Sequence, residues 1–195
     1  MPSKADPPTL PFATRAKWAA WLAKHHGEQD GVWVKFAKKA SGIPTVTFQE
    51  ALDVALCWGW IDGQSRSLDE DWYLQRFTPR RARSTWSKRN RTKALELIES
   101  GEMKPPGLAE VERAKSDGRW DAAYDSASTI QVPDDLRAAL DAKPKAAKAF
   151  AELDGQNRYA ILYRVHQAKR PETRARRIKE YVAMLARGEL LYPRS

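Results

Sequence analysis

Three short segments alternate between apolar and polar side chains, and everything after Ser84 repeats its apolar residues at helical spacing instead. The alternating segments are residues 32–38, 60–66 and 72–78. A period of two puts successive side chains on opposite faces of a sheet, whereas spacings of three and four put them on one side of a helix. The sequence therefore predicts an α+β fold that is mostly helical. We expect a small antiparallel sheet with packed helices, followed by a C-terminal helical module.

Helices are also expected beside these strands, at residues 14–26, 47–58 and 85–100. The second begins with the T-x-x-E spacing of a capping box, in which Thr47 and Glu50 satisfy free backbone donors. Ser84 or Thr85 is the expected N-cap of the third helix.

The chain divides into two predicted regions, an N-terminal α+β part at residues 1–125 and a C-terminal helical module at residues 132–195. Between them the stretch SASTIQVP has no regular period and reads as an irregular connection. Each helix of the module has one apolar stripe to bury, so we expect the helices to pack as one compact unit. The expected helices are at residues 134–142, 144–153, 155–169 and 172–187.

The sequence lacks the signals of a membrane, secreted or metal-binding protein. No apolar run approaches the roughly 18 to 20 residues that cross a bilayer. The N-terminal stretch MPSKADPPTLPFATR reads as a proline-stiffened tail rather than as a signal peptide. Cys57 is the only cysteine, which excludes an internal disulfide, and no Cys/His spacing suggests zinc. We therefore expect a cytoplasmic protein with no membrane span, metal or cofactor.

The balance of charge favours a polyanionic partner, either an anionic small molecule or a nucleic acid. The net charge is +9 at pH 7 and the pI is about 9.7, and clustered cations release condensed counterions when they bind phosphates. Exposed lysines that only solvate a surface would give the same balance. Residues 158–179 carry eight basic side chains against one acidic one, and both interpretations apply to this second basic surface as well.

The sharpest change of charge lies between residues 50 and 93, which also hold four of the eight tryptophans. From Arg76 to Lys93 there are eight basic residues and no acidic one. An anion at the start of the helix predicted at residues 85–100 would meet free N–H groups and arginine side chains. Aromatic rings beside arginines also hold nucleotides and single strands. The candidate ligand-binding residues are Trp58, Trp60, Asp62, Gln64, Arg80, Arg81, Ser84, Trp86, Ser87, Lys88 and Asn90.

We expect these residues to form a cleft with an anion site. Its two walls would be Asp62 and Gln64 on one side and Arg80, Arg81, Ser84 and Asn90 on the other. Asn90 interrupts the apolar inner row of its predicted helix, and a buried amide must be hydrogen-bonded to the backbone or to a ligand. In the alternative interpretation, the arginines pair with the acidic residues 69–71 and only fasten a loop.

An enzyme is a second interpretation, with Asp62 or Asp53 as general acid or base and with Arg80 and Arg81 positioning a substrate. Glu50 and Asp53 share one edge of their predicted helix, and a poorly solvated carboxylate pair raises one pKa. A capping role for Glu50 and an arginine partner for Asp53 would explain both carboxylates without catalysis. The sequence contains no P-loop, GxGxxG or nucleophile-elbow pattern.

Several motifs are specific enough to identify a family, above all GWIDGQ and FTPRRARSTWSK. The segments that carry the similarity are GVWVKFAKKASG at 31–42, EALDVALCWGWIDGQ at 50–64, LDEDWYLQRFTPRRARSTWSKRNR at 68–91, GLAEVERAKSDGRWDAAYD at 107–125 and AKRPETRARRIKEYVAMLARGE at 168–189. Through them the chain resembles the YdeI/OmpD-associated family, whose members are often labelled bacteriocin-protection proteins. The similarity covers nearly the whole chain.

This resemblance implies a mixed α/β N-terminal part followed by a helical module. It also implies a stress or bacteriocin-tolerance protein that acts through protein contacts, as the family label says. The family has no established reaction, cofactor or active site, so no catalytic residue can be carried over. Three classes of function stay open: a protein that binds an anionic ligand or nucleic acid, an enzyme of unknown reaction, and a protein-interaction module without a ligand.

Overall fold

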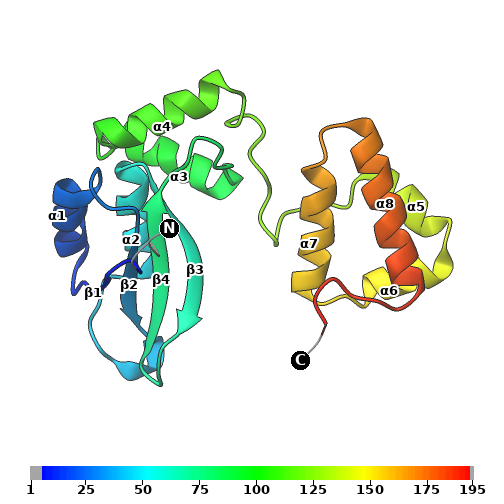
Figure 1. Ribbon diagram of the computed structural model, residues 1–195, viewed down its shortest axis with the longest axis horizontal. Coiled ribbons are helices and arrows are strands. Elements are labelled where there is room, and N and C mark those ends of the chain that lie inside the picture. The colour runs from blue at the N-terminus through cyan, green and yellow to red at the C-terminus, as the bar shows by residue number, and fades with distance from the viewer. Residues whose placement is uncertain (1–5, 194–195) are drawn as a thin grey trace, which may run out of the picture. The chain divides into compact units, whose positions relative to one another are not determined.

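The computed structural model describes residues 6–193 of the chain. The contacts divide the chain into two compact units, Met1–Ala123 (unit 1) and Tyr124–Ser195 (unit 2), which are drawn in Figure 1. The described part of unit 1 contains a sheet and four α-helices, and that of unit 2 contains four further α-helices. The predicted α+β class, mostly helical with a small sheet, is confirmed.

Unit 1 is built on a four-stranded sheet with the strand order β1-β2-β4-β3. Its strands are β1 (Thr9–Pro11), β2 (Val32–Ala37), β3 (Trp60–Ser67) and β4 (Trp72–Pro79). β4 pairs with β2 on one side and with β3 on the other, both in antiparallel register. The three strands expected from alternation are thereby confirmed.

The alternation pattern does not predict β1, and this strand makes the sheet mixed rather than purely antiparallel. β1 lies parallel to β2, with Thr9 opposite Trp33, and the N–H of Trp33 donates to the carbonyl of Pro8 at 2.8 Å. The expectation of a proline-stiffened tail is therefore wrong for these residues. Three residues are too few to show a period, and a proline such as Pro11 is tolerated because β1 is an edge strand.

Four helices and one 3-10 turn complete unit 1. They are α1 (Arg15–His25), η1 (Lys39–Ser41), α2 (Phe48–Cys57), α3 (Lys88–Glu99) and α4 (Pro105–Ser116). Thr14 caps α1 by accepting a hydrogen bond from the backbone N–H of Lys17. Thr47 and Glu50 form the capping box that the sequence predicts at the start of α2.

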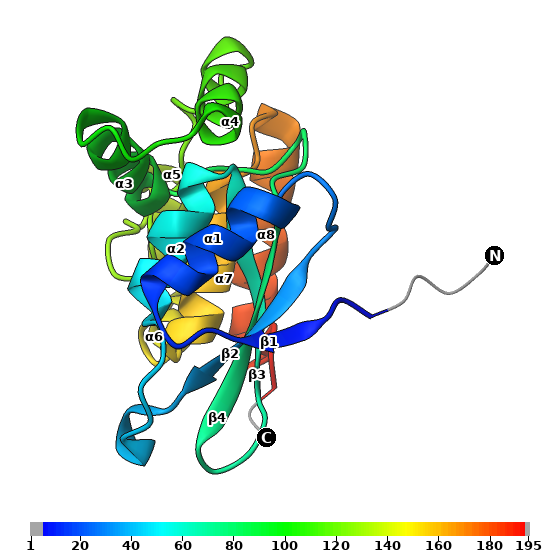
Figure 2. The same ribbon diagram turned by 90° about the vertical axis from the view of Figure 1, so that its left-hand side faces the viewer.

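The sheet has two faces with different chemistry. One face, here called the core face, presents Val34, Phe36 and Phe77, each at most 1% exposed. These side chains belong to one apolar cluster with Trp18 of α1 and Leu56 of α2, and Figure 2 shows both helices lying over the sheet on the same side. The opposite face, here called the cation face, presents Trp33, Lys35, Arg66, Trp72, Leu74 and Arg76.

The helix expected at residues 85–100 begins three residues later than predicted, at Lys88. Its N-cap is Ser87, whose hydroxyl accepts from the backbone N–H of Asn90 at 3.1 Å. Neither Ser84 nor Thr85 caps it, so that expectation is wrong. Ser84 instead closes a turn, because its hydroxyl accepts from the N–H of Arg81 at 2.9 Å and its own N–H donates to the Arg81 carbonyl at 2.9 Å. Serine readily makes local bonds of this kind, which compete with helix formation.

Unit 2 is a helical bundle in which every helix follows a stop or start signal of the sequence. Its helices are α5 (Asp134–Asp141), α6 (Pro144–Ala151), α7 (Gly155–His166) and α8 (Pro171–Ala186). Leu136, Leu162 and Ile178 belong to its apolar core. The four predicted helices are present, with ends shifted by a few residues. Within residues 6–193, no helix has both the length and the apolar character to span a bilayer.

Candidate functional site

The acidic turn between β3 and β4 does not fasten the arginines that follow β4. Asp69 accepts the backbone N–H groups of Asp71 and Trp72, at 3.0 and 2.8 Å. This turn precedes β4, whereas Arg80 and Arg81 follow it, and a strand of this length separates the two by roughly 25 Å at 3.3 Å per residue. The alternative in which the arginines pair with residues 69–71 is therefore wrong.

Two adjoining cavities lie beside these arginines in unit 1. The larger has a volume of about 850 Å³ and the smaller about 200 Å³. Gln64, Arg76 and Arg81 line both of them. We call the pair the arginine cavity, since the arginines in its walls are Arg66, Arg76, Arg80 and Arg81.

Arg76 lines this cavity and carries a buried donor. It lies on β4 directly opposite Trp33 of β2, and its Nε–H is buried without an acceptor among the described residues. The neighbouring Gly31 has a φ of +155°, and a Cβ built there would lie 3.6 Å from this Nε and 3.1 Å from the carbonyl oxygen of Phe77. Glycine therefore keeps this side of the guanidinium clear.

Arg81 supplies a second guanidinium. Its backbone is fixed by the turn to Ser84, while its side chain is exposed and makes no hydrogen bond or ion pair within the part of the chain that is described. Arg80 has a different role. It is 6% exposed, its guanidinium carbon lies 3.6 Å from the centre of the Trp86 ring, and its Nη1 donates to the Thr85 carbonyl at 3.3 Å. Arg80 therefore fixes the loop before α3 in place.

The larger cavity also has acidic lining residues. These are Asp6, Glu28 and Asp30, which line it together with Gly31. His25 lies close to Glu28, with its Nδ1 3.5 Å from the carboxylate. The lining of the cavity thus combines arginines with carboxylates.

The aromatic candidates from the sequence lie outside the cavity. Trp60 is 1% exposed and its indole N–H donates to the His26 carbonyl at 3.2 Å, so its ring belongs to the core. Trp58 is half-buried, with its ring centre 4.7 Å from that of His26. Trp86 is 2% exposed beneath Arg80. The tryptophan that does line the cavity is Trp33; only the pairing of β2 with β4 places it beside Arg76.

The remaining candidates divide between the cavity and the start of α3. Gln64 and Ser84 line the cavity. Asp62 and Asn90 do not line it, and Ser87 and Lys88 form the start of α3. Asp62 lies opposite Phe77 on β4; burial raises its pKa, and the positive charges of Arg80 and Arg89 offset this only in part.

The carboxylates proposed for acid–base chemistry have structural partners. Glu50 accepts the backbone N–H and the hydroxyl of Thr47, and these bonds lower its pKa. That shift is opposite to the one a general acid needs. Asp53 accepts a hydrogen bond from the side-chain amide of Gln49 at 2.7 Å and lies 4.0 Å from Nζ of Lys93. Its basic partner is therefore a lysine and not the expected arginine. Within residues 6–193, no group of three or more His, Cys, Asp or Glu side chains could hold a metal ion.

The basic surface of unit 2 is largely occupied by contacts within the protein. Arg174 donates twice to Asp135, at 2.5 and 2.8 Å, and once to the Val165 carbonyl at 2.9 Å. Arg177 donates to the carbonyl of Arg164. The described contacts of these side chains therefore favour a structural role in unit 2.

Two family models match the chain. One, described as a domain of unknown function (DUF8412), matches residues 10–110. The other, described as "Bacteriocin-protection, YdeI or OmpD-Associated", matches residues 129–188 and confirms the family expected from the sequence. The motifs between residues 31 and 91 fall within the first match. No curated protein and no solved structure matches the chain. The chain thus belongs to the DUF8412 family and carries a YdeI/OmpD-associated domain after it.

Proposed function

We propose that this member of the two families binds a phosphate-bearing ligand in the arginine cavity of unit 1. The observation that carries the proposal is Arg76, which lines both cavities and whose buried Nε–H has no acceptor among residues 6–193. A buried donor left unpaired costs about 1–3 kcal/mol, and more when the group is charged. A phosphate group beside Arg76 would balance the positive charge of this guanidinium and supply acceptors for its N–H groups.

Arg81 provides the second contact that such a ligand needs. Its guanidinium lines both cavities and is not engaged within the described chain. Arginine side chains match phosphate oxygens with paired N–H donors, and charge-assisted bonds of this kind are about twice as strong as neutral ones. Arg76 and Arg81 can therefore hold one phosphate group between them.

The acidic lining of the larger cavity narrows the class of ligand. Glu28 lines it together with the arginines, and carboxylates accept hydrogen bonds from hydroxyl and amino groups. This carboxylate would repel a further phosphate. A nucleotide, with its phosphates at the arginines and its sugar hydroxyls or base amino group at Glu28, fits this mixed lining and a volume of about 850 Å³.

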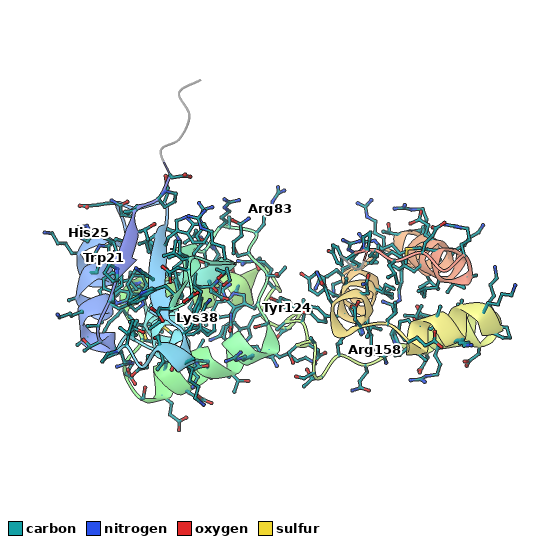
Figure 3. All side chains as sticks on the ribbon, turned by 90° about the horizontal axis from the view of Figure 1, so that it is seen from below. Trp21, His25, Lys38, Arg83, Tyr124 and Arg158 are labelled. Atoms are coloured by element: carbon teal, nitrogen blue, oxygen red, sulfur yellow. The ribbon has the colours of Figure 1, made fainter. Side chains whose placement is uncertain are left out.

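Isothermal titration with ADP tests the proposal on the full chain. We expect Arg81→Ala to weaken binding by about 1.5–3 kcal/mol, the usual worth of a hydrogen bond to a charged group. Arg83→Ala is the matched control, because Arg83 is exposed, lies outside both cavities and points outward in Figure 3. Equal losses in the two variants, or no binding by the unchanged protein, would contradict the proposal.

A role in bacteriocin protection is a second candidate, favoured by the match over residues 129–188. It is tested by producing the full chain in a bacteriocin-sensitive bacterium and measuring survival. Protection that is lost in Arg81→Ala but kept in Arg83→Ala would link the two roles through the cavity. Protection that is equal in both variants would separate this role from the cavity, and no protection by the unchanged chain would exclude it.

A further inference from the structure

We infer that the cation face of the sheet binds a single-stranded nucleic acid whose backbone enters the arginine cavity. The inference rests on the proposed phosphate site, because Arg76 belongs both to the cavity and to this face. Here the ligand is a polymer, and it runs along the surface of the sheet.

The strand register builds a continuous surface from three strands. Trp33 lies opposite Arg76, and Lys35 lies opposite Leu74. On the other side of β4, Arg66 also lies opposite Leu74. Leu74 is 2% exposed beneath these long side chains. The outer layer of this face therefore consists of cations and tryptophans over one buried leucine.

Each tryptophan of this layer carries a cation on its ring. The guanidinium carbon of Arg66 lies 4.3 Å from the centre of the Trp33 ring, and Nζ of Lys35 lies 4.1 Å from that of Trp72. Neither cation makes an ion pair within the described residues. These contacts hold two positive charges at fixed places on the surface without neutralising them.

Such an arrangement matches a single strand better than other polyanions. Bases stack on arginine planes as well as on aromatic rings, and Arg66 offers its outer side above Trp33, which is itself 7% exposed. Trp72 is half-buried. From Trp72 to Arg76 the strand advances about 13 Å, enough for a short run of splayed nucleotides with phosphates beside Lys35 and Arg76. A duplex keeps its bases stacked inside and cannot use the rings.

The test is fluorescence anisotropy on the full chain with a labelled oligothymidylate of about twelve nucleotides, within the usual range for one binding surface. We expect its affinity to exceed that for ADP and to fall with salt at a log–log slope of about −2, from three phosphate contacts on a single strand. Lys35→Gln should reduce the slope by about 0.7. Trp72→Ala should weaken binding about 5- to 150-fold, the range for loss of a stacked base.

Lys17→Gln is the matched control, since Lys17 is exposed on α1 on the core-face side of the sheet; it should leave affinity and slope unchanged. Lys35→Gln keeps the test decisive if Trp72→Ala does not fold. The inference is overturned if Lys35→Gln loses no more affinity than Lys17→Gln. It is also overturned if a duplex binds as tightly as the single strand. If ADP binds but the oligothymidylate binds no tighter, the polymer is excluded and the nucleotide site stands. If neither binds, both proposals fail.

Discussion

Arg76 and Arg81 of unit 1 differ from Arg174 and Arg177 of unit 2 in what they contact. In unit 2, Arg174 is engaged by Asp135 and by a backbone carbonyl, and Arg177 by another carbonyl. In unit 1, Arg76 keeps a buried Nε–H without an acceptor and Arg81 keeps its whole guanidinium unengaged within the described chain. Similar densities of positive charge in the sequence therefore conceal two uses, one that stabilises the fold and one that is available to a ligand.

This difference shows that net charge is a poor guide to a binding site. A charge of +9 raises the chance that the chain binds an anionic partner, but it does not show which arginines contact that partner. An arginine is available to a ligand only where its guanidinium lacks a partner within the protein. The contrast predicts opposite effects on stability when arginines of the two units are removed, and those effects can be measured separately because all eight tryptophans lie in unit 1.

The largest effect is expected in unit 2. Arg174→Ala should lower the free energy of unfolding of this unit by about 2 kcal/mol, because it removes a paired bond to a carboxylate and a bond to the Val165 carbonyl. Arg176→Ala is the control: its exposed pair with Glu180, four residues on, should be worth only about 0.3–0.5 kcal/mol. Hydrogen exchange of the full chain in urea measures unit 2 directly. Equal losses would remove the contrast between the units.

A smaller effect of opposite sign is expected in unit 1. Arg76→Met keeps most of the side-chain volume and removes a buried donor that has no acceptor in the described structure, so it should raise the free energy of unfolding by about 1 kcal/mol. Tryptophan fluorescence during urea unfolding measures it, and titration of the same variant with ADP should show weaker binding. A clear loss of stability would mean that Arg76 is structural, as in unit 2.

The smallest effect concerns acid sensitivity. The side-chain bonds from Arg174 lower the pKa of Asp135, so their contribution to stability is present above the unfolded pKa of the carboxylate and is lost as pH falls through the folded pKa. Solvent screening limits it to about 0.5 kcal/mol, since Asp135 is partly exposed. In Arg174→Ala, unit 2 should lose less stability on acidification than in the unchanged protein, as followed by hydrogen exchange at several pH values. The same acid response in both proteins would contradict this.

The fold was largely accessible from the sequence, because period alone identifies β2, β3, β4 and the helices. The errors came where local bonds decide the outcome. The Ser84 hydroxyl closes a turn and delays α3 to Lys88. β1 is held by pairing with β2, which no local pattern reveals in three residues.

The candidate site was accessible only in part. The change of charge pointed to Arg81, Gln64 and Ser84, which line the cavity. It could not point to Trp33 or Glu28, because the fold of unit 1 brings these residues beside β4. Nor could it distinguish a tryptophan of the core, such as Trp60, from one at a surface.

A crystal structure of the full chain soaked with ADP tests the phosphate site. We expect phosphate density in the arginine cavity, with oxygens within hydrogen-bond distance of the guanidinium groups of Arg76 and Arg81. Phosphate density confined to the arginines of unit 2, or an ordered cavity without ligand in crystals saturated with ADP, would contradict it.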